Sequence, residues 1–275
     1  MSQYYTPHKT RNLFDPLRHG LGQASKEPFK LSRSKIDLFI ECPRCFYLDR
    51  RLGVSRPPGF PFNLNSAVDA LLKKEFDIHR AKNTAHPLMK TYKIDAVPFE
   101  HKDINIWRDT FKGISFLHEP TNFLVFGGID DVWINPKKEL HVVDYKATSK
   151  NSEVNLDAEW QDGYKRQMEV YQWLFEKNNF AVSPTGFFVY ANAGRDREAF
   201  DGRLEFDVKI IPYNGSSGWV EGALRDMLAL LTSHDMPQKG GDCDYCLYRE
   251  AVSEVIHEKD DDNRTQKRVA TQRLF

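Results

Sequence analysis

The sequence has no excess of either charge, no long apolar run and few cysteines. Its 275 residues carry 39 lysines and arginines against 39 aspartates and glutamates, so the formal net charge is zero. Overall charge therefore cannot attract a polyanion, and any nucleic-acid binding must come from local charge patterns. The first residues lack a signal pattern, and no segment approaches the roughly 18 consecutive apolar residues of a membrane span. We expect a soluble, cytoplasmic protein with no membrane partner.

The four cysteines all lie in two Cys-x-x-Cys pairs, Cys42 with Cys45 and Cys243 with Cys246. In a reducing compartment such pairs hold metals more often than they form disulfides, and a chain of this length can bury a full core without disulfides. Four thiolates suit either a structural tetrahedral Zn²⁺ or a [4Fe–4S] cluster, and their spacing does not decide between the two. Two independent pairs of buried thiols remain the alternative. A shared centre would link the two ends of the chain and stabilise the fold by up to about 5 kcal/mol.

The hydrophobic pattern predicts one α/β domain, spanning residues 31–256, with a central mixed β-sheet flanked by helices. Residues 1–30 lack periodicity and are expected to form a flexible arm, and residues 257–275 are too charged to pack and are expected to form a flexible tail. Helices are expected after a cap at Ser34, from Pro43 to Gly53, and over residues 66–82, 156–178 and 218–233; strands are expected over 122–134, 139–148, 185–192 and 203–213.

Acidic and basic side chains come together on the hairpin that residues 122–148 are expected to form. Asp130 follows Gly127-Gly128, whereas Asp144 and Lys146 lie two apart on the partner strand and so share a face. Two carboxylates on adjacent strands provide oxygen ligands for Mg²⁺ or Mn²⁺, and a lysine beside them can act on water or on a developing phosphate charge. The alternative is a polar strand end with a surface ion pair. Asp144 follows two valines in a strand that looks buried, where an unpaired carboxylate is costly, and this favours the metal site.

The chain resembles the PD-(D/E)xK nuclease superfamily, and within it the RecB-type branch that includes AddB-like nucleases and CRISPR-adaptation nucleases. The resemblance is carried, in the order of that family, by SRSKIDLFIECPRCFYL, GGIDDVWI, VVDYKAT, QMEVY and CDYCLYRE. It implies a restriction-endonuclease-like core in which Asp130 and Asp144 bind the metal and Lys146 is catalytic. It also implies that Gln167 and Tyr171, which lie one helical turn apart, contact DNA; a core aromatic is the alternative for Tyr171.

The chain departs from that family at two places. Asp69 stands where the branch usually has a histidine metal ligand, and an aspartate suits Mg²⁺. Its alternative role is a capping box with Ser66. Relatives with an iron-sulfur centre usually have one cysteine before the core and three after it, but this chain has two and two. The sequences around the cysteines resemble the cluster-bearing ends of the branch, which favours a [4Fe–4S] cluster over Zn²⁺.

The sequence therefore predicts a metal-dependent deoxyribonuclease that acts on single-stranded or end-containing DNA, as an exonuclease rather than an endonuclease, in repair, recombination or defence. The alternative is a DNA-binding or assembly module that does not cleave. The apolar end of the charged tail, Leu274-Phe275, offers a docking segment for a protein partner. Basic residues near the first cysteine pair and near the hairpin are candidates for phosphate contacts, with Trp160 and Tyr164 available to stack on bases. The basic residues are Arg44, Arg50, Arg51, Arg56, Lys146, Lys150, Lys165 and Arg166.

Overall fold

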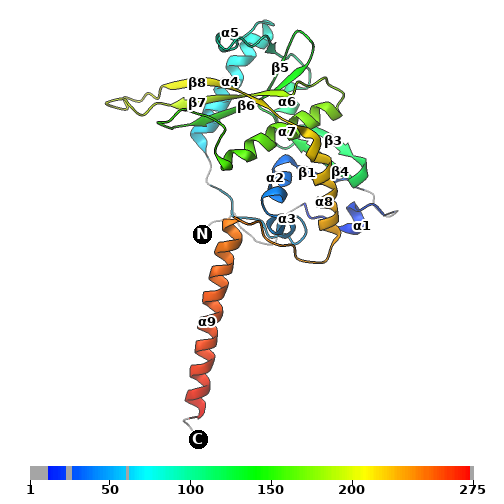
Figure 1. The fold of residues 1–275 in the computed structure, drawn as a ribbon, viewed down its shortest axis with the longest axis vertical. Coiled ribbons are helices and arrows are strands. Elements are labelled where there is room, and N and C mark those ends of the chain that lie inside the picture. Colours follow the sequence, from blue (N-terminus) through cyan, green and yellow to red (C-terminus); the bar gives the residue numbers. More distant parts are fainter. Residues whose placement is uncertain (1–11, 23–26, 60–61, 273–275) are drawn as a thin grey trace. The chain divides into compact units, whose positions relative to one another are not determined.

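A computed structural model of the chain describes residues 12–22, 27–59 and 62–272 (Figure 1). The chain divides into two compact units, where one domain was expected. The sheet unit comprises Phe14–Asp37 and Pro58–Thr232, and the cysteine unit is built around Leu38–Pro57 and the segment from Ser233 onward. No helix in the described parts of the chain has the length and apolar character needed to cross a membrane.

A five-stranded mixed sheet is the centre of the sheet unit, and its strand order is β2-β5-β6-β7-β8. Only β6 and β7 run parallel, and the other neighbours are antiparallel. The α/β class and the mixed sheet flanked by helices predicted from sequence are therefore confirmed. The strands are β2 (Val97–Pro98), β5 (Asp131–Ile134), β6 (Leu140–Thr148), β7 (Thr185–Ala193) and β8 (Phe206–Asn214).

The helix α4 (Asn63–Ala81) covers one face of this sheet and α7 (Asp162–Lys177) packs against β6 as well. Leu72 and Phe76 of α4 pack in one core cluster with Val143 and Tyr145 of β6. Because side chains alternate along a strand, Asp144 and Lys146 point to the opposite face, where α7 lies. The register of β6 thus separates its apolar residues from its charged ones.

A second, three-stranded sheet has the order β1-β4-β3, with β1 (Phe29–Ser32) parallel to β4 (Phe123–Gly127) and β3 (Ile114–His118) antiparallel to it. Phe14, Phe29 and Phe123 pack edge to face, and all three are buried. Packed structure therefore begins inside the segment 1–30, which was expected to be a flexible arm. A short helix, α1 (Pro16–His19), also lies in that segment, whereas residues 1–11 and 23–26 lie outside the described part.

The expected strand 122–134 is divided between the two sheets, because the chain leaves β4 at Gly127 and enters β5 at Asp131. A Cβ at Gly127 would lie 2.6 Å from the ring of Tyr171, and one at Gly128 would lie 3.0 Å from the carbonyl oxygen of Asp109. Only glycine permits the approach at Gly127, and a side chain at Gly128 would crowd the Asp109 backbone. The hairpin prediction was correct for β5 and β6, and Asp130 lies in the link just before them.

Helix boundaries differ from expectation where the first turn carries no strong signal. The helix α2 (Arg33–Glu41) begins before Ser34, so this serine lies in the first turn and is not the cap. The start of α4 at Asn63 places Ser66 inside the helix, where its hydroxyl donates to the Phe62 carbonyl oxygen at 3.2 Å. The capping-box explanation for Asp69 is therefore wrong. Elements without a sequence prediction include α5 (Pro87–Thr91), α6 (Ile104–Trp107), β2 and β3.

The cysteine unit contains α3 (Pro43–Arg50) and α9 (Asp244–Gln272). The helix α8 (Val220–Thr232) is the last element of the sheet unit and comes before α9 in the chain. Cys42 is the N-cap residue of α3, with Pro43 in the first turn as expected. The helix α9 continues through residues 257–272, part of the segment expected to be a flexible tail. The proposed docking end at Leu274-Phe275 lies outside the described residues.

Candidate active site and cysteine centre

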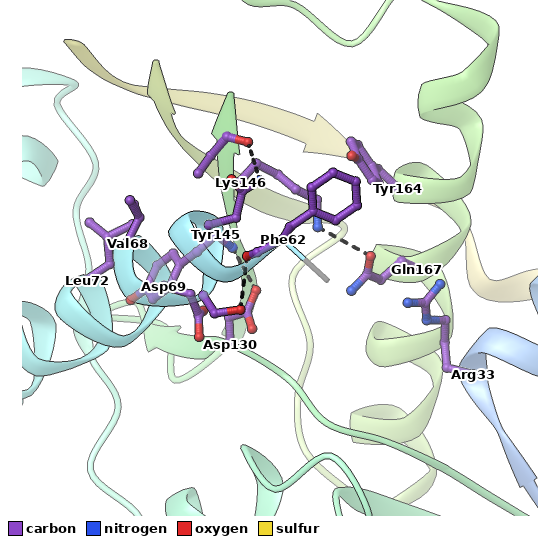
Figure 2. A pocket seen from close by; sticks show the side chains of 13 residues that line it. Arg33, Phe62, Val68, Asp69, Leu72, Asp130, Tyr145, Lys146, Tyr164 and Gln167 are labelled. Carbon is purple, nitrogen blue, oxygen red and sulfur yellow. Dashed lines mark hydrogen bonds between the residues drawn. The ribbon is translucent and has the colours of Figure 1, made fainter. Parts of the chain in front are cut away.

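Several of the predicted site residues meet at one cavity of about 410 Å³ in the sheet unit (Figure 2). Asp69 reaches it from α4, Asp130 from the link between the sheets, Lys146 from β6 and Gln167 from α7. Asp144 lies behind Lys146 on the same strand and is completely buried. Residues that are far apart in the sequence thus converge on one place, as the sequence predicted.

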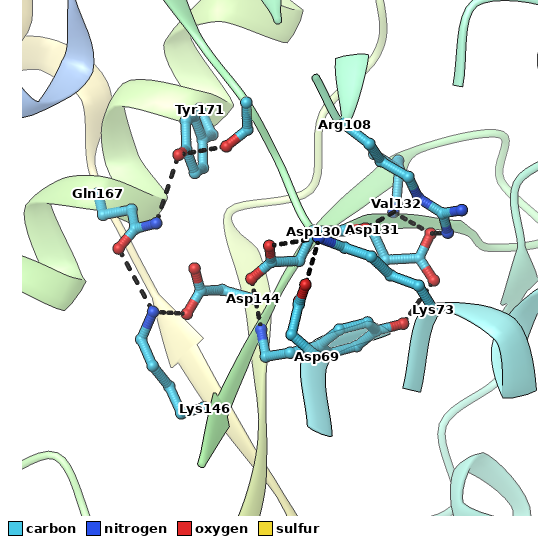
Figure 3. Close-up of polar contacts among 12 residues, drawn as sticks. Asp69, Lys73, Arg108, Asp130, Asp131, Val132, Asp144, Lys146, Gln167 and Tyr171 are labelled. Atoms are coloured by element: carbon cyan, nitrogen blue, oxygen red, sulfur yellow. Dashed lines mark hydrogen bonds and ion pairs between the residues drawn. The ribbon is translucent and has the colours of Figure 1, made fainter. Parts of the chain in front are cut away.

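Asp144 and Lys146 form an ion pair at the base of this site (Figure 3). Both carboxylate oxygens of Asp144 are buried, and the ammonium of Lys146 is the one donor among the described residues that contacts them, so Lys146 is the charge that compensates this carboxylate. Burial raises the pKa of Asp144 to about 6, against the opposing attraction of Lys146. Burial alone would lower the pKa of Lys146, but the negative charges of Asp144 and Asp130 raise it above its ordinary value. The lysine is therefore held in its protonated form.

Asp69 and Asp130 share a second ammonium group, that of Lys73 (Figure 3). Lys73 Nζ donates to Asp69 Oδ2 at 2.9 Å and to Asp130 Oδ1 at 3.2 Å, and the other oxygen of Asp130 accepts from the Tyr145 backbone N–H at 2.8 Å. Burial raises the pKa of Asp69, and the charge of Asp130 adds to this effect. The two carboxylates are thus arranged around a cation. The sequence analysis missed Lys73, although its position one helical turn after Asp69 was a usable signal.

A chain of hydrogen bonds connects Lys146 to the break between the two sheets (Figure 3). Lys146 Nζ donates to Gln167 Oε1 at 3.4 Å, and Gln167 Nε2 donates to the Tyr171 hydroxyl at 3.3 Å. That hydroxyl donates in turn to the Gly128 carbonyl oxygen at 2.6 Å. Tyr171 is only 4% exposed, so it positions the link that carries Asp130. Because the ring of Tyr171 is buried, it does not support the predicted contact with DNA. Gln167 does line the cavity.

Asp131, next to Asp130, belongs to a separate buried network. Its carboxylate accepts hydrogen bonds from Arg80, from Arg108 and from the Tyr145 hydroxyl, the last at 2.7 Å. Arg108 also donates to the Asp130 carbonyl oxygen at 3.0 Å, which fixes the backbone of the link. The adjacent aspartates therefore differ in role, since Asp131 is satisfied within the protein and Asp130 faces the cavity. Sequence reasoning did not find this network, because its arginines lie far from the hairpin in the chain.

The four cysteines lie together in the cysteine unit, with all four Sγ atoms within 4.8 Å of one another. Three of the Sγ–Sγ distances are 3.5 Å (Cys45–Cys243), 3.7 Å (Cys45–Cys246) and 3.7 Å (Cys42–Cys246), and all four side chains are buried and form no disulfide. The alternative of two independent thiol pairs is therefore wrong. Within the described residues, this is the one group of His, Cys, Asp or Glu side chains gathered so tightly.

Hydrogen-bond donors surround the cysteine sulfurs. The backbone N–H groups of Gly240 and Cys45 lie 3.3 and 3.4 Å from Cys42 Sγ, and Arg56 Nη2 lies 3.4 Å from Cys243 Sγ. Burial raises the pKa of Cys42, but these two N–H groups, together with the thiols of Cys45 and Cys243, lower this pKa to about 6. Such donors stabilise thiolates, the form that binds metal.

Two arginines that the sequence offered as phosphate contacts are used inside the cysteine unit. Arg56 pairs with Glu41 at 2.8 Å, in addition to its contact with a cysteine sulfur. Arg44 pairs with Glu250 at 2.8 Å. The contacts of Arg56 with Cys243 and of Arg44 with Glu250 connect the two chain segments of the unit around the cysteines, and the structure therefore gives both arginines a structural role.

Comparison with known proteins identifies the family. Residues 30–251 match the PD-(D/E)XK nuclease superfamily, which is more than half of the 275 residues. The chain belongs to this superfamily. The superfamily predicted from sequence is confirmed, and the RecB-type branch stays a prediction. A solved structure described as "Crystal structure of SSO0001" aligns with the chain at a TM-score of 0.37 and 14% sequence identity, over 82% of this chain and 85% of the other. No curated protein matches the chain.

Membership of the PD-(D/E)XK nuclease superfamily indicates a metal-dependent nuclease, and the acidic residues of the cavity fit a divalent cation. The buried oxygens of Asp144 are met, among the described residues, only by the Lys146 ammonium, and Asp69 and Asp130 are bridged by a second cationic group. Oxygen ligands of this kind suit Mg²⁺ and Mn²⁺. The two ammonium groups hold the carboxylates in separate sets, Asp69 with Asp130 and Asp144 with Lys146. A bound cation would replace Lys73 as the charge between the first two.

Proposed function

We propose that this PD-(D/E)XK nuclease hydrolyses DNA with Mg²⁺ or Mn²⁺ held by Asp69, Asp130 and Asp144. The observation that carries the proposal is the completely buried carboxylate of Asp144, whose oxygens are met, among the described residues, only by the ammonium of Lys146 at the base of the cavity. Structural stability alone gives no reason to bury a carboxylate in this way. We further propose single-stranded or end-containing DNA as the substrate and exonucleolytic cleavage as the reaction, in repair, recombination or defence.

The roles of the residues follow from their charges and contacts. A bound cation would neutralise charge on the phosphodiester and lower the pKa of the attacking water. The ammonium of Lys146, which lines the cavity, would donate to negative charge that develops on the phosphate. Asp144 and Gln167 hold that ammonium from two sides. Tyr171 acts as a positioning residue, through Gln167 and through the Gly128 carbonyl.

A cleavage assay on four DNA substrates tests this proposal. Single- and double-stranded DNA, each labelled at the 5′ or the 3′ end, is incubated with purified, anaerobically prepared protein and Mg²⁺ or Mn²⁺. We expect metal-dependent loss of single-stranded DNA, with mononucleotides or short products released from one labelled end. Binding without cleavage under every metal condition would contradict the proposal and favour the non-cleaving module. Cleavage of closed circular DNA would contradict exonuclease action alone.

Two substitutions on α4 test the cation site and should act in opposite directions. Asp69→Asn removes a proposed ligand, so we expect the Mg²⁺ concentration for half-maximal activity to rise by about tenfold or more. Lys73→Gln removes the ammonium that competes for Asp69 and Asp130, so we expect that concentration to fall. Titrations of activity against Mg²⁺, with thermal unfolding measured in parallel, separate metal binding from stability. Equal metal titrations for Asp69→Asn and the unmodified protein would rule out Asp69 as a ligand.

For the cysteine centre we propose a single Zn²⁺, the alternative to the cluster predicted from sequence. Four sulfurs at the Zn–S distance of about 2.3 Å form a tetrahedron with edges of roughly 3.8 Å. The three sulfur distances of 3.5 to 3.7 Å, with all four Sγ atoms within 4.8 Å of one another, support this geometry. A [4Fe–4S] cluster places four irons and four sulfides between the cysteines and needs its ligands considerably farther apart. The centre's role is structural, since it joins α3 to the start of α9.

A further inference from the structure

A second cavity, of about 610 Å³, adjoins the catalytic cavity in the sheet unit. The two share part of their lining, from the start of α4, the end of β6 and the first turn of α7. The shared residues are Phe62, Asn65, Val68, Ala147 and Tyr164. A molecule bound at the catalytic residues can therefore extend into the second cavity without leaving the protein surface.

The two cavities differ in chemical character. The catalytic cavity is lined by charged groups, among them Arg33, Asp130 and Lys146, which suit a phosphodiester and its cation. None of the described side chains lining the second cavity carries a charge. Its walls combine apolar and aromatic groups such as Phe206 with neutral hydrogen-bonding groups such as Thr148. This combination suits a flat, neutral group with polar edges, which is the chemistry of a nucleobase.

Aromatic side chains at the boundary of the two cavities are placed to stack on such a group. Phe62 is 74% exposed and occupies the N-cap position of α4 without a side-chain capping bond, so its ring contributes neither to the core nor to the helix end. Tyr164 contacts the catalytic lysine, whose Nζ lies 4.4 Å from the ring centroid. Both rings are labelled in Figure 2. Trp160, one turn before Tyr164, is 59% exposed.

We propose that the second cavity binds an unpaired nucleobase next to the phosphodiester that is cleaved, with Phe62 and Tyr164 as its stacking residues. The proposal rests on the proposed nuclease function and names the part of the substrate that this surface recognises. A paired base inside a duplex is stacked on both faces and cannot enter the cavity. The site therefore selects single strands and frayed ends, with little preference among bases, because each has a π-face.

Binding of two single-stranded oligonucleotides, measured without added Mg²⁺ or Mn²⁺ and without chelator, tests the proposal. One oligonucleotide has a fully abasic backbone. The other keeps a single base at its centre, and this base can enter the cavity. We expect the unmodified protein to prefer the second by about 5- to 150-fold, the range for one stacked base. Phe62→Ala should lose most of this preference. Phe111→Ala is the matched control, because Phe111 is 80% exposed in the same unit and lines neither cavity.

Equal binding of both oligonucleotides by the unmodified protein would overturn the base-binding proposal. The same preference in Phe62→Ala and in the unmodified protein would overturn it as well, since the stacking contact would then be absent. Cleavage is measured separately from base preference, so that the two proposals can fail independently. If the protein shows the preference but cleaves no DNA when Mg²⁺ or Mn²⁺ is added, the nuclease proposal fails and the base site stands.

Discussion

Asp144→Asn is expected to reduce the rate of DNA cleavage by more than about 100-fold and to leave the fold in place. The asparagine has nearly the same shape, so packing in the completely buried site is kept, whereas the charge that holds Lys146 and the proposed cation is lost. Substitution of a residue that only supports a metal ligand typically reduces activity by up to about 100-fold, and substitution of a ligand itself should reduce it by more. Initial rates on end-labelled single-stranded DNA at saturating Mg²⁺ or Mn²⁺, with circular dichroism to monitor folding, measure the effect.

Asp226→Asn provides the matched control for this experiment. Asp226 is exposed on α8 and does not line the catalytic cavity, so the same chemical change there should leave both cleavage and unfolding temperature unchanged. Cleavage by Asp144→Asn at the rate of the unmodified protein would refute the assignment. A parallel loss of folded signal in Asp144→Asn would mean that the aspartate serves stability and not chemistry.

Cys246→Ser is expected to remove the metal from the cysteine centre and to unfold the cysteine unit. A tetrahedral site needs all four thiolates, and the binding free energy of a structural Zn²⁺, about 10–16 kcal/mol in small zinc-binding peptides, is also folding free energy. The zinc content measured by elemental analysis should therefore fall from one zinc per chain to nearly none. Limited proteolysis should newly cut within residues 38–57 and 233–257. Ser253→Ala, at an exposed position of the same helix, is the control and should keep its zinc.

The colour of the unmodified protein decides between the two candidate centres. Colourless protein with one equivalent of zinc supports the tetrahedral site. Brown protein with broad absorbance near about 400 nm and bound iron would refute zinc and support the cluster that the sequence favoured. Protein with neither metal, prepared without oxygen or chelators, would exclude a shared centre altogether.

Sequence patterns predicted the elements that carry their own periodicity or motif. The helical spacing of Leu72 and Phe76 located α4, and Val142-Val143 before Asp144 identified a buried strand, both as found. The paired cysteines predicted a joint centre, and the structure brings them together. The helix and the strand were predictable because each depended on residues close together in the chain, and the cysteine centre was predictable because each pair carries its own Cys-x-x-Cys motif.

Features that depend on distant contacts were not predictable in this way. The two-residue strand β2 and the five-residue strand β3 have too little sequence to show alternation. The division of the strand at Gly127 depends on the ring of Tyr171, more than 40 residues away. The arginine network around Asp131 is satisfied by side chains from α4 and from beyond α6. Such pairings become visible only once the chain is folded.

The wide separation of the two cysteine pairs sets an order of events during protein synthesis. Cys243 follows Cys45 by 198 residues, a stretch that includes nearly all of the sheet unit. At a translation rate of about 5–20 residues per second, the second pair emerges about 10–40 s after the first. During that interval the sheet unit can fold, while Cys42 and Cys45 are present without Cys243 and Cys246. Capture of the proposed metal would thus follow folding of the sheet unit, and only chains translated past Cys246 could complete the site.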